Sequence, residues 1–271
     1  MIKLSQNVRS MCAILISWNS YKAERGSLRP SGNRVGLRFM CHELRIPESS
    51  QCKSWGLFKW ENVMSYRQQR DYENLNKAIF EGAGPYNIPI IAPDDPEVDN
   101  WLSFNYAKGC EEPELHGIHF FIDDYQFVRI WKTPDVYLNM LKKFQAVCTP
   151  DFSTYTDFPK AIQIYNHYRK HWLGAYWQMN GIRVIPTISW ADWDSYEWCF
   201  DGEPEGYTVA VSSVGTQISK DARHLFLDGY REMMIRLQPS KIIMYGNIPD
   251  ECDGNIVPVK AFQQKWRQSE K

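Results

Sequence analysis

The chain has 271 residues, of which 44% are hydrophobic and 23% charged, so it can bury a full core and is not generally disordered. No apolar run approaches the roughly 18 residues that a membrane-spanning helix needs, and the seven scattered cysteines, without a CxxC pair, suit a reducing compartment, so we expect a cytoplasmic protein with no membrane partner. The net charge is only −1, but residues 1–77 carry 13 Lys and Arg against 6 Asp and Glu, so basic groups are concentrated near the N-terminus.

The first 85 residues are predicted to form a basic appendage. Residues 20–36 are rich in Gly, Ser, Pro and Arg, a composition typical of an exposed loop. Arg25, Arg29 and Arg34 lie in this loop, where they could contact the phosphates of a nucleic acid, an acidic partner protein or the acidic remainder of the chain. A solvated basic surface without a partner is the plain alternative.

The boundary of this appendage is marked by glycine and proline. Residues 61–81 have a helical composition, and the sequence GAGP that follows opposes continuation of a helix. The core domain is therefore predicted to comprise residues 86–271.

Beyond residue 85 the chain repeats one pattern. A short apolar run is followed by a polar or acidic turn and then by an amphipathic stretch, which predicts buried strands alternating with helices. The predicted strands lie at residues 87–92, 118–122, 146–149, 183–189, 207–212 and 241–245. The predicted helical segments lie at residues 97–108, 125–144, 159–179, 195–200 and 221–238.

This alternation favours parallel βα connections, and therefore an α/β fold around a parallel sheet. A barrel-like or partial (β/α) barrel is preferred, because polar residues follow nearly every strand. An open doubly wound sheet is the alternative. In both arrangements the active site lies at the C-terminal ends of the strands.

Aspartates follow several of the predicted strands. We predict that Asp123, Asp151 and Asp192 converge at this edge, where they would act as acid and base or hold a divalent cation such as Mg²⁺ or Mn²⁺. Asp124 is the neighbour of Asp123 in an extended segment, so its side chain is expected to point away and cap the following helix. Each aspartate taken singly is better explained as a cap or turn residue, so the prediction rests on the set.

Four further residues are predicted to bind substrate. Trp190 follows a strand and could stack on a base, and Ser212 belongs to the segment VSSVG, which could form a small anion-binding turn. Asn166 and Arg169 lie at i, i+3 on one helix face, from which Arg169 would balance the carboxylates. The alternative for VSSVG is an ordinary loop, and the alternative for Arg169 is a surface ion pair.

Two histidines have a metal-binding spacing without the rest of a motif. His167 and His171 lie at i, i+4 of a predicted helix, but Tyr168, Arg169 and Lys170 stand between them in place of the acidic residue of HExxH. Because the intervening positive charge opposes a cation, we interpret both as core or surface histidines.

Several motifs between residues 118 and 246 resemble one known family. They are FFIDDYQF (120–127), TPDFSTYTDFP (149–159), QIYNHYRKHWLGAYWQ (163–178), IPTISWAD (185–192), CFDG (199–202), VAVSSVG (209–215) and MYG (244–246). In this order, over about half of the chain, they are similar to the domain-of-unknown-function family numbered 4417. The resemblance implies a bacterial, phage or mobile-element protein and brings no activity or catalytic residue.

The leading hypothesis is a phage or mobile-element enzyme, such as a metal-dependent hydrolase, that acts on a nucleic acid or a nucleotide through an acidic site. The alternative is a non-catalytic protein that binds and inhibits a host defence enzyme, since aromatic and arginine side chains are what binding hot spots favour. A plain nucleic-acid-binding protein is a third possibility, for which affinity would fall steeply with salt.

Overall fold

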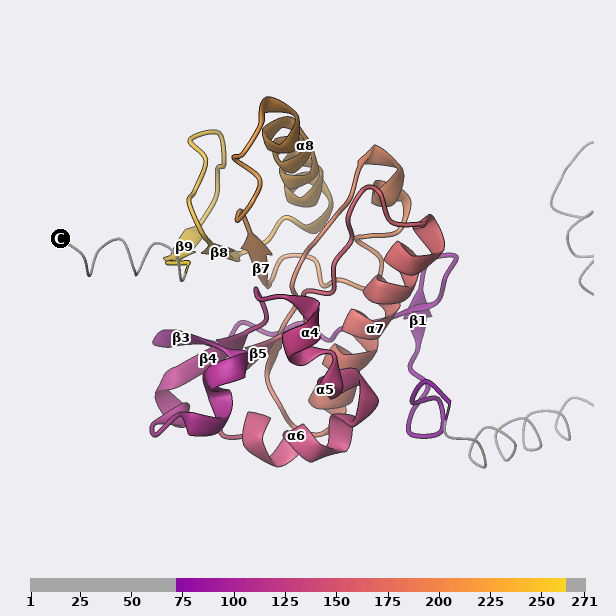
Figure 1. Cartoon of the computed structure of the whole chain (residues 1–271), viewed down its shortest axis with the longest axis vertical. Coiled ribbons are helices and arrows are strands. Elements are labelled where there is room, and N and C mark those ends of the chain that lie inside the picture. Colours follow the sequence, from indigo (N-terminus) through magenta and orange to yellow (C-terminus); the bar gives the residue numbers. More distant parts are fainter. Residues whose placement is uncertain (1–71, 262–271) are drawn as a thin grey trace, which may run out of the picture. The chain divides into compact units, whose positions relative to one another are not determined.

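The strands of the structure are mostly parallel and pair in chain order. The computed structural model describes residues 72–261, which belong to one compact unit (Figure 1). The first parallel sheet has the order β3 (Asn100–Ser103), β4 (His116–His119), β5 (Ala146–Cys148), β6 (Val184–Ile185). The second has the order β7 (Thr208–Ser212), β8 (Lys241–Tyr245), β9 (Ile256–Val259).

Backbone hydrogen bonds join the two sheets just beyond β6. Thr187 forms an isolated parallel bridge to Ala210 of β7. The Ile188 amide donates to the Ala210 carbonyl at 2.8 Å, and the Ala210 amide donates to the Pro186 carbonyl at 2.8 Å. The parallel pairing therefore continues from β3 to β9, in the order in which the strands occur along the chain.

Helices and short helical turns connect these strands. The α-helices are α4 (Asp124–Phe127), α5 (Arg129–Lys132), α6 (Pro134–Leu141), α7 (Lys160–Met179) and α8 (Lys220–Leu237). The 3₁₀ turns are η1 (Phe104–Gly109), η2 (Pro113–Leu115) and η3 (Trp193–Glu197). A separate antiparallel pair is formed by β1 (Gly82–Ala83) and β2 (Ile88–Pro89). Within residues 72–261, no helix has the length and apolar character to cross a bilayer.

The two long helices begin and end where their sequences direct. The Ser219 hydroxyl caps α8 by accepting from the Ala222 amide at 3.1 Å, and α8 ends at Gln238, whose φ of 44° is left-handed. Pro159 precedes the first turn of α7, and Gly181 with φ of 79° follows its end. The positions of both helices agree with the sequence prediction to within one residue.

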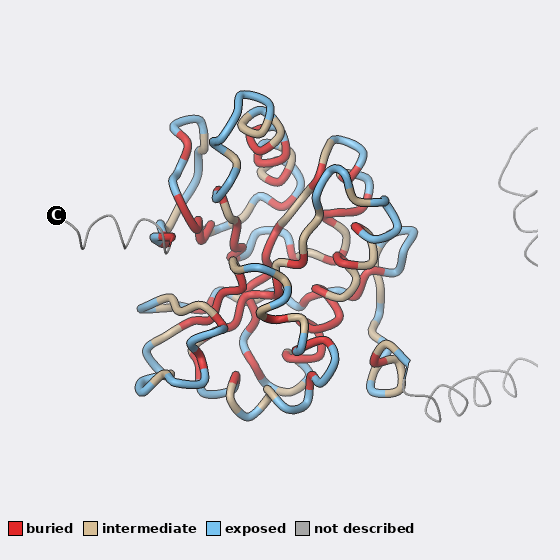
Figure 2. Tube along the Cα trace, viewed as in Figure 1, coloured by how far each residue is buried: buried red, intermediate tan, exposed pale blue. Residues whose placement is uncertain are grey.

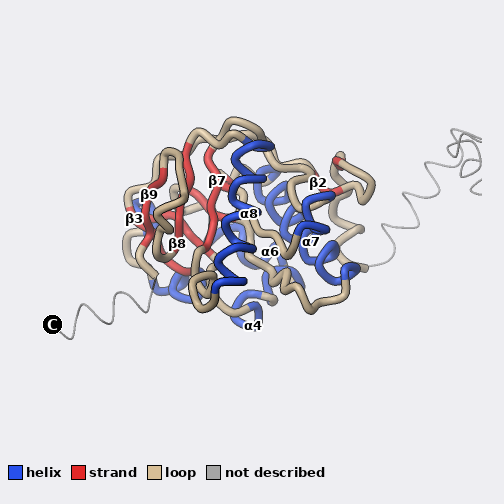
Figure 3. Tube along the Cα trace, turned by 90° about the horizontal axis from the view of Figure 1, so that it is seen from above, coloured by secondary structure: helices blue, strands red, loops and turns tan. Residues whose placement is uncertain are grey.

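Alternate residues of the strands pack on opposite sides of the sheets. One side forms a cluster shared by strands from both sheets, and the other faces the helices. The shared cluster contains Ala146, Cys148, Ile185, Ala210, Ile243, Tyr245 and Val259, with Trp101 and Phe121 against it. The intervening residues pack against α7 or α8, as Val209 and Val211 do against α8. Figure 2 shows the buried positions following the strands and the inner faces of these helices, and Figure 3 shows α8 beside β7 and β8.

Two strands of the parallel sheets, β3 and β9, were not predicted from the sequence, and neither was the short strand β1. β3 lies where residues 97–108 predicted a helix, because its backbone pairs with β4 and Trp101 and Leu102 pack on different clusters, so that tertiary pairing overrides local propensity. β9 contains Pro258, which argues against a strand in the sequence, but β9 is the edge of its sheet and an edge strand tolerates proline. Conversely, residues 87–92 supply only β2, which pairs antiparallel with β1.

The described part of the predicted helix at residues 61–81 is not helical. Glu73 and Asn74 have φ of 48° and 61°, and the turn they form sends the Asn74 side chain to the Trp131 carbonyl at 2.7 Å. A continuous helix would forfeit that buried contact. Residues 61–71, and Arg25, Arg29 and Arg34, lie outside the described residues.

The structure establishes an α/β fold built on parallel sheets. Within residues 72–261, no hydrogen-bonded pairing between β3 and β9 closes the strands into a barrel. The barrel-like arrangement and the domain boundary at residue 85 therefore stay predictions.

Candidate functional site

A cavity of about 920 Å³ opens at the C-terminal ends of the parallel strands. Residues that end or follow the strands from β3 to β8 line it, as in other parallel α/β proteins, whose sites lie at this edge. The polar and charged part of the lining is Ser103, Asn105, Asp123, Asp124, Gln126, Asp151, Ser153, Thr154, Ser189 and Ser212. The aromatic part is Tyr106, Phe121, Tyr125, Tyr155, Phe158, Trp190 and Tyr245.

Asp123 and Asp124 follow β4, and both line the cavity. The Asp123 carboxylate is exposed and accepts one long hydrogen bond from the Gln126 side chain at 3.4 Å. The Asp124 carboxylate accepts from the Ser153 amide at 3.2 Å and from the Ser153 hydroxyl at 2.9 Å, which joins the loop after β4 to the loop after β5. Asp124 begins α4, so the backbone is no longer extended there, and the expectation that it points away is wrong.

Asp151 follows β5 and is the most perturbed carboxyl group of the cavity. Burial raises the pKa of Asp151 to about 7, the Lys170 ammonium opposes that rise, and the Asp124 carboxylate adds to it. No hydrogen bond joins the Asp151 carboxylate to another residue of the described part of the chain. A carboxyl group with a pKa near neutrality can accept or release a proton at physiological pH.

Asn166 and Arg169 support the cavity wall from behind, without lining the cavity. The Asn166 amide donates to the Ser153 carbonyl at 2.6 Å, and the Arg169 guanidinium donates to the Asn166 carboxamide oxygen. The same guanidinium lies 4.0 Å from the centre of the Phe152 ring. These contacts hold the segment whose Ser153 binds Asp124, so Asn166 and Arg169 position a wall of the cavity.

The other predicted site residues have different surroundings. Trp190 lines the cavity, and its indole N–H donates to the Leu225 carbonyl of α8 at 3.2 Å, which fixes the ring as part of the wall. Ser212 lines the cavity and accepts from the Val214 amide at 3.3 Å. Asp192 precedes η3, where its carbonyl accepts from the Ser195 amide at 2.9 Å, and it does not line the cavity. Asp123, Asp124 and Asp151 therefore line one cavity, and Asp192 does not. Among the described residues, the three aspartates do not form a group whose ligand atoms all lie within 4.8 Å of one another.

Three exposed tyrosines of the lining were missed from the sequence. Tyr106, Tyr125 and Tyr155 are 52%, 76% and 62% exposed and follow β3, β4 and β5 in turn. For Tyr125 and Tyr155 the available signal was their position two and four residues after the strand-end aspartates Asp123 and Asp151, in DDY and DFSTY. Tyr106 had no such signal, because β3 itself was not predicted.

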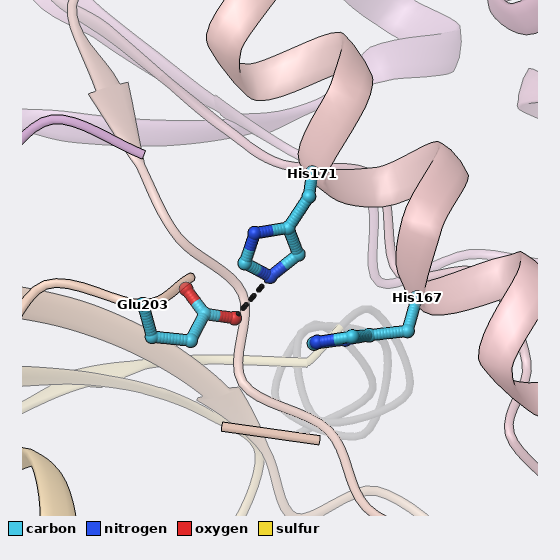
Figure 4. A group of neighbouring side chains, drawn as sticks. All are labelled: His167, His171 and Glu203. Atoms are coloured by element: carbon cyan, nitrogen blue, oxygen red, sulfur yellow. Dashed lines mark hydrogen bonds and ion pairs between the residues drawn. The ribbon is translucent and has the colours of Figure 1, made fainter. Parts of the chain in front are cut away.

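A second group of titratable side chains is buried beside α7. His167 and His171 project from α7 toward Glu203, and the three ligand atoms lie within 4.8 Å of one another (Figure 4). His171 Nδ1 is 2.8 Å from the Pro89 carbonyl and Nε2 is 2.8 Å from Glu203 Oε1. Since a carbonyl only accepts, Nδ1 must carry a hydrogen, and the Nε2 contact needs a second proton. The three side chains could ligate a metal ion, but both ring nitrogens of His171 are already engaged in hydrogen bonds, to the Pro89 carbonyl and to Glu203.

Lys170 completes this buried group and opposes a metal ion there. Its ammonium lies 3.2 Å from Glu203 Oε1 and donates to the Thr187 carbonyl at 2.6 Å. Burial alone would raise the pKa of Glu203, but His171 and Lys170 hold it below its ordinary value. Burial and the charges of His171 and Lys170 hold the pKa of His167 well below its usual value. Glu203 belongs to no motif, and nothing in the sequence pointed to it.

Comparison with known proteins gives one family and phage relatives. The family model described as Domain of unknown function (DUF4417) matches residues 80–263. A Gene 1 protein of Mycobacterium phage L5 is 39% identical over 202 residues, which cover 73% of this chain and 88% of the phage protein. A Gene 1 protein of Mycobacterium phage D29 is 38% identical over 202 residues, covering 73% and 75% of the two chains. No solved structure matches.

Proposed function

Since the chain belongs to the DUF4417 family and is similar to bacteriophage proteins, we propose that it acts on a nucleotide or nucleic acid through a divalent cation held in the strand-end cavity. The observation that carries the proposal is the convergence of Asp123, Asp124 and Asp151 on one cavity. Carboxylate oxygens are the ligands that Mg²⁺ and Mn²⁺ prefer. The proposal uses Asp124 where the sequence had suggested Asp192.

The environment of Asp151 supports this choice of chemistry. Its pKa of about 7 reflects burial next to a second carboxylate, and a cation between the two would remove that repulsion. A bound divalent cation supplies charge for a phosphate and activates water. Asp151 would then hold the cation with its ionised carboxylate, which is the role that we propose for it.

We also propose a barrel-like arrangement of the strands and a phosphate-binding role for the N-terminal appendage. Side chains from β3 to β9 share one cluster, which supports a barrel-like curvature of the parallel strands and places their C-terminal ends around one cavity. Residues 1–85 would form the basic appendage, and Arg25, Arg29 and Arg34 would contact phosphates. The free cysteines of the described part support a cytoplasmic setting.

Binding of Mn²⁺ to the full chain tests the proposal. We expect one bound Mn²⁺ by electron paramagnetic resonance, with affinity at least tenfold lower in Asp151→Asn and in Asp123→Asn, because each loses a charged ligand. The matched control is Asp157→Asn, an exposed residue of the loop after β5 that does not line the cavity. Equal affinity in all four proteins would exclude these carboxylates as the site.

A second candidate is the inhibitor of a host defence enzyme. Trp193 and Ile218 are 76% and 84% exposed and do not line the cavity, and large exposed apolar side chains mark protein-binding surfaces. A stoichiometric complex with a bacterial enzyme that survives Asp151→Asn and is lost in Trp193→Ala with Ile218→Ala would select this candidate over the metal-dependent enzyme.

A further inference from the structure

The cavity wall contains negative charge without any matching positive side chain. Asp123, Asp124 and Asp151 line it, and among the described residues no Lys, Arg or His does. Two cations lie behind the wall without lining the cavity. The Lys170 ammonium is held by the Thr187 carbonyl and Glu203, and the Arg169 guanidinium, whose charge acts on Asp124, is held by Asn166 and the Phe152 ring. A phosphate that entered alone would therefore meet carboxylates and no cation.

Repulsion between the cavity carboxylates and a phosphate determines which ligands can bind. Like charges repel several times more strongly in the partly buried surroundings of a protein than in water. With Asp123 and Asp124 both facing the cavity, a free phosphate would be repelled by more than one carboxylate. An anionic ligand is thus accepted only when a cation enters with it.

The tyrosines at the cavity provide a different kind of contact. Tyr106, Tyr125 and Tyr155 line the cavity and are more than half exposed. Tyr155 is held at its backbone, where its carbonyl accepts from the Gln163 side chain at 2.9 Å, and at its ring, which lies edge-on to Phe158. Exposed, held aromatic rings are platforms on which an unpaired base can stack.

Building on the proposed function, we propose that the ligand of the cavity is an unpaired nucleotide, free or at a single-stranded end, which binds through its phosphate only as a complex with a divalent cation while its base stacks on the exposed tyrosines. The cavity volume of about 920 Å³ lies in the range of small-molecule sites. The neutral side chains of Ser103, Asn105 and Gln126 are the groups that would hydrogen-bond a sugar or base. A paired base in a duplex hides its faces and would not reach the tyrosines.

Calorimetric titration of the full chain separates the two contacts. Adenosine carries the base without phosphate, and adenosine monophosphate carries both. We expect adenosine to bind equally with Mg²⁺ or with EDTA, and the monophosphate to bind at least tenfold more tightly with Mg²⁺ than with EDTA. Tyr125→Ala and Tyr155→Ala should each weaken both ligands by about tenfold. The matched control is Tyr86→Ala, which removes a partly exposed ring that does not line the cavity.

Each other outcome has a definite meaning. If the monophosphate binds as tightly in EDTA, or if Tyr125→Ala and Tyr155→Ala bind as the control does, the inference is overturned. If Mn²⁺ binds the carboxylates but neither ligand binds, the inference fails and the metal site stands. If the cavity binds spermidine but neither Mn²⁺ nor adenosine, it is a site for an organic cation, and both this inference and the proposed function fail.

Discussion

At the scale of single residues, the carboxyl groups of Glu203 and Asp151 have different surroundings. Glu203 lies between the charged groups of His171 and Lys170, within 3.2 Å of both. Asp151 has no such partner at hydrogen-bonding distance, and its pKa is raised to about 7 by burial. Removing one member of the first group would leave an uncompensated buried charge, whereas the charged form of the second costs stability, as residues reserved for binding or catalysis often do.

Glu203→Gln should destabilise the protein strongly. The substitution leaves the buried Lys170 and His171 without a counter-charge, and breaking a buried ion pair in this way typically costs about 3–5 kcal/mol. The measurement is the free energy of unfolding by urea at pH 7. Glu205→Gln removes an exposed carboxylate of the same loop and should change the unfolding free energy by less than about 0.5 kcal/mol. Similar losses in both variants would contradict the role assigned to Glu203.

Asp151→Asn should have the opposite effect, and the effect should depend on pH. The folded pKa of about 7 lies above the ordinary value of 3.8, so the folded state keeps a proton that the unfolded state releases between these values. The contribution of Asp151 is therefore most favourable below pH 3.8 and is lost as the pH rises through 7. We expect the stability of Asp151→Asn relative to wild type to increase between pH 4 and pH 8 in urea unfolding without added metal. A difference that stays constant over this range would show that Asp151 is not perturbed.

At the scale of elements, the sequence predicted features that depend on neighbouring residues, such as helix ends. It did not predict features that depend on contacts with residues far along the chain. The bounds of α7 and α8 follow from Pro159, Gly181 and Ser219, which act within a turn of each helix end. β3 could not be recognised, because residues 97–108 become a strand only by pairing with β4. The strand-end aspartates were recognisable from their position after apolar runs, whereas Glu203 approaches His171 from 32 residues away.

The packing of α8 against Trp190 gives a prediction for one cavity wall. A Cβ at Gly229 would lie 2.2 Å from the Trp190 indole nitrogen, so Gly229→Ala must displace the ring or the helix. We expect a loss of about 1–3 kcal/mol in unfolding free energy, as for other overpacked sites, together with a shift of Trp190 fluorescence. Gly109→Ala is the control, because nothing lies within 4 Å of its added Cβ. Equal stability of the two variants would contradict this account of the wall.

At the scale of the whole molecule, the parallel strands explain why residues at the ends of seven strands share a cavity. Parallel strands place all their C-terminal ends at one edge, so polar residues that end or follow the strands from β3 to β8 line one cavity without being near in sequence. The chain belongs to the DUF4417 family and is similar to Gene 1 proteins of two mycobacteriophages. We propose the chemistry at this edge, because in the group of His167, His171 and Glu203 beside α7 the Lys170 ammonium lies 3.2 Å from Glu203 and opposes a cation.

The most direct test is a crystal of the full chain soaked in Mn²⁺ and measured for anomalous scattering. We predict an anomalous peak within about 2.0–2.4 Å of carboxylate oxygens of Asp151 and of Asp123 or Asp124, and no such peak in a crystal of Asp151→Asn. A peak at His167, His171 and Glu203 alone, or no peak at the strand-end cavity, would contradict the proposal that these carboxylates hold a divalent cation.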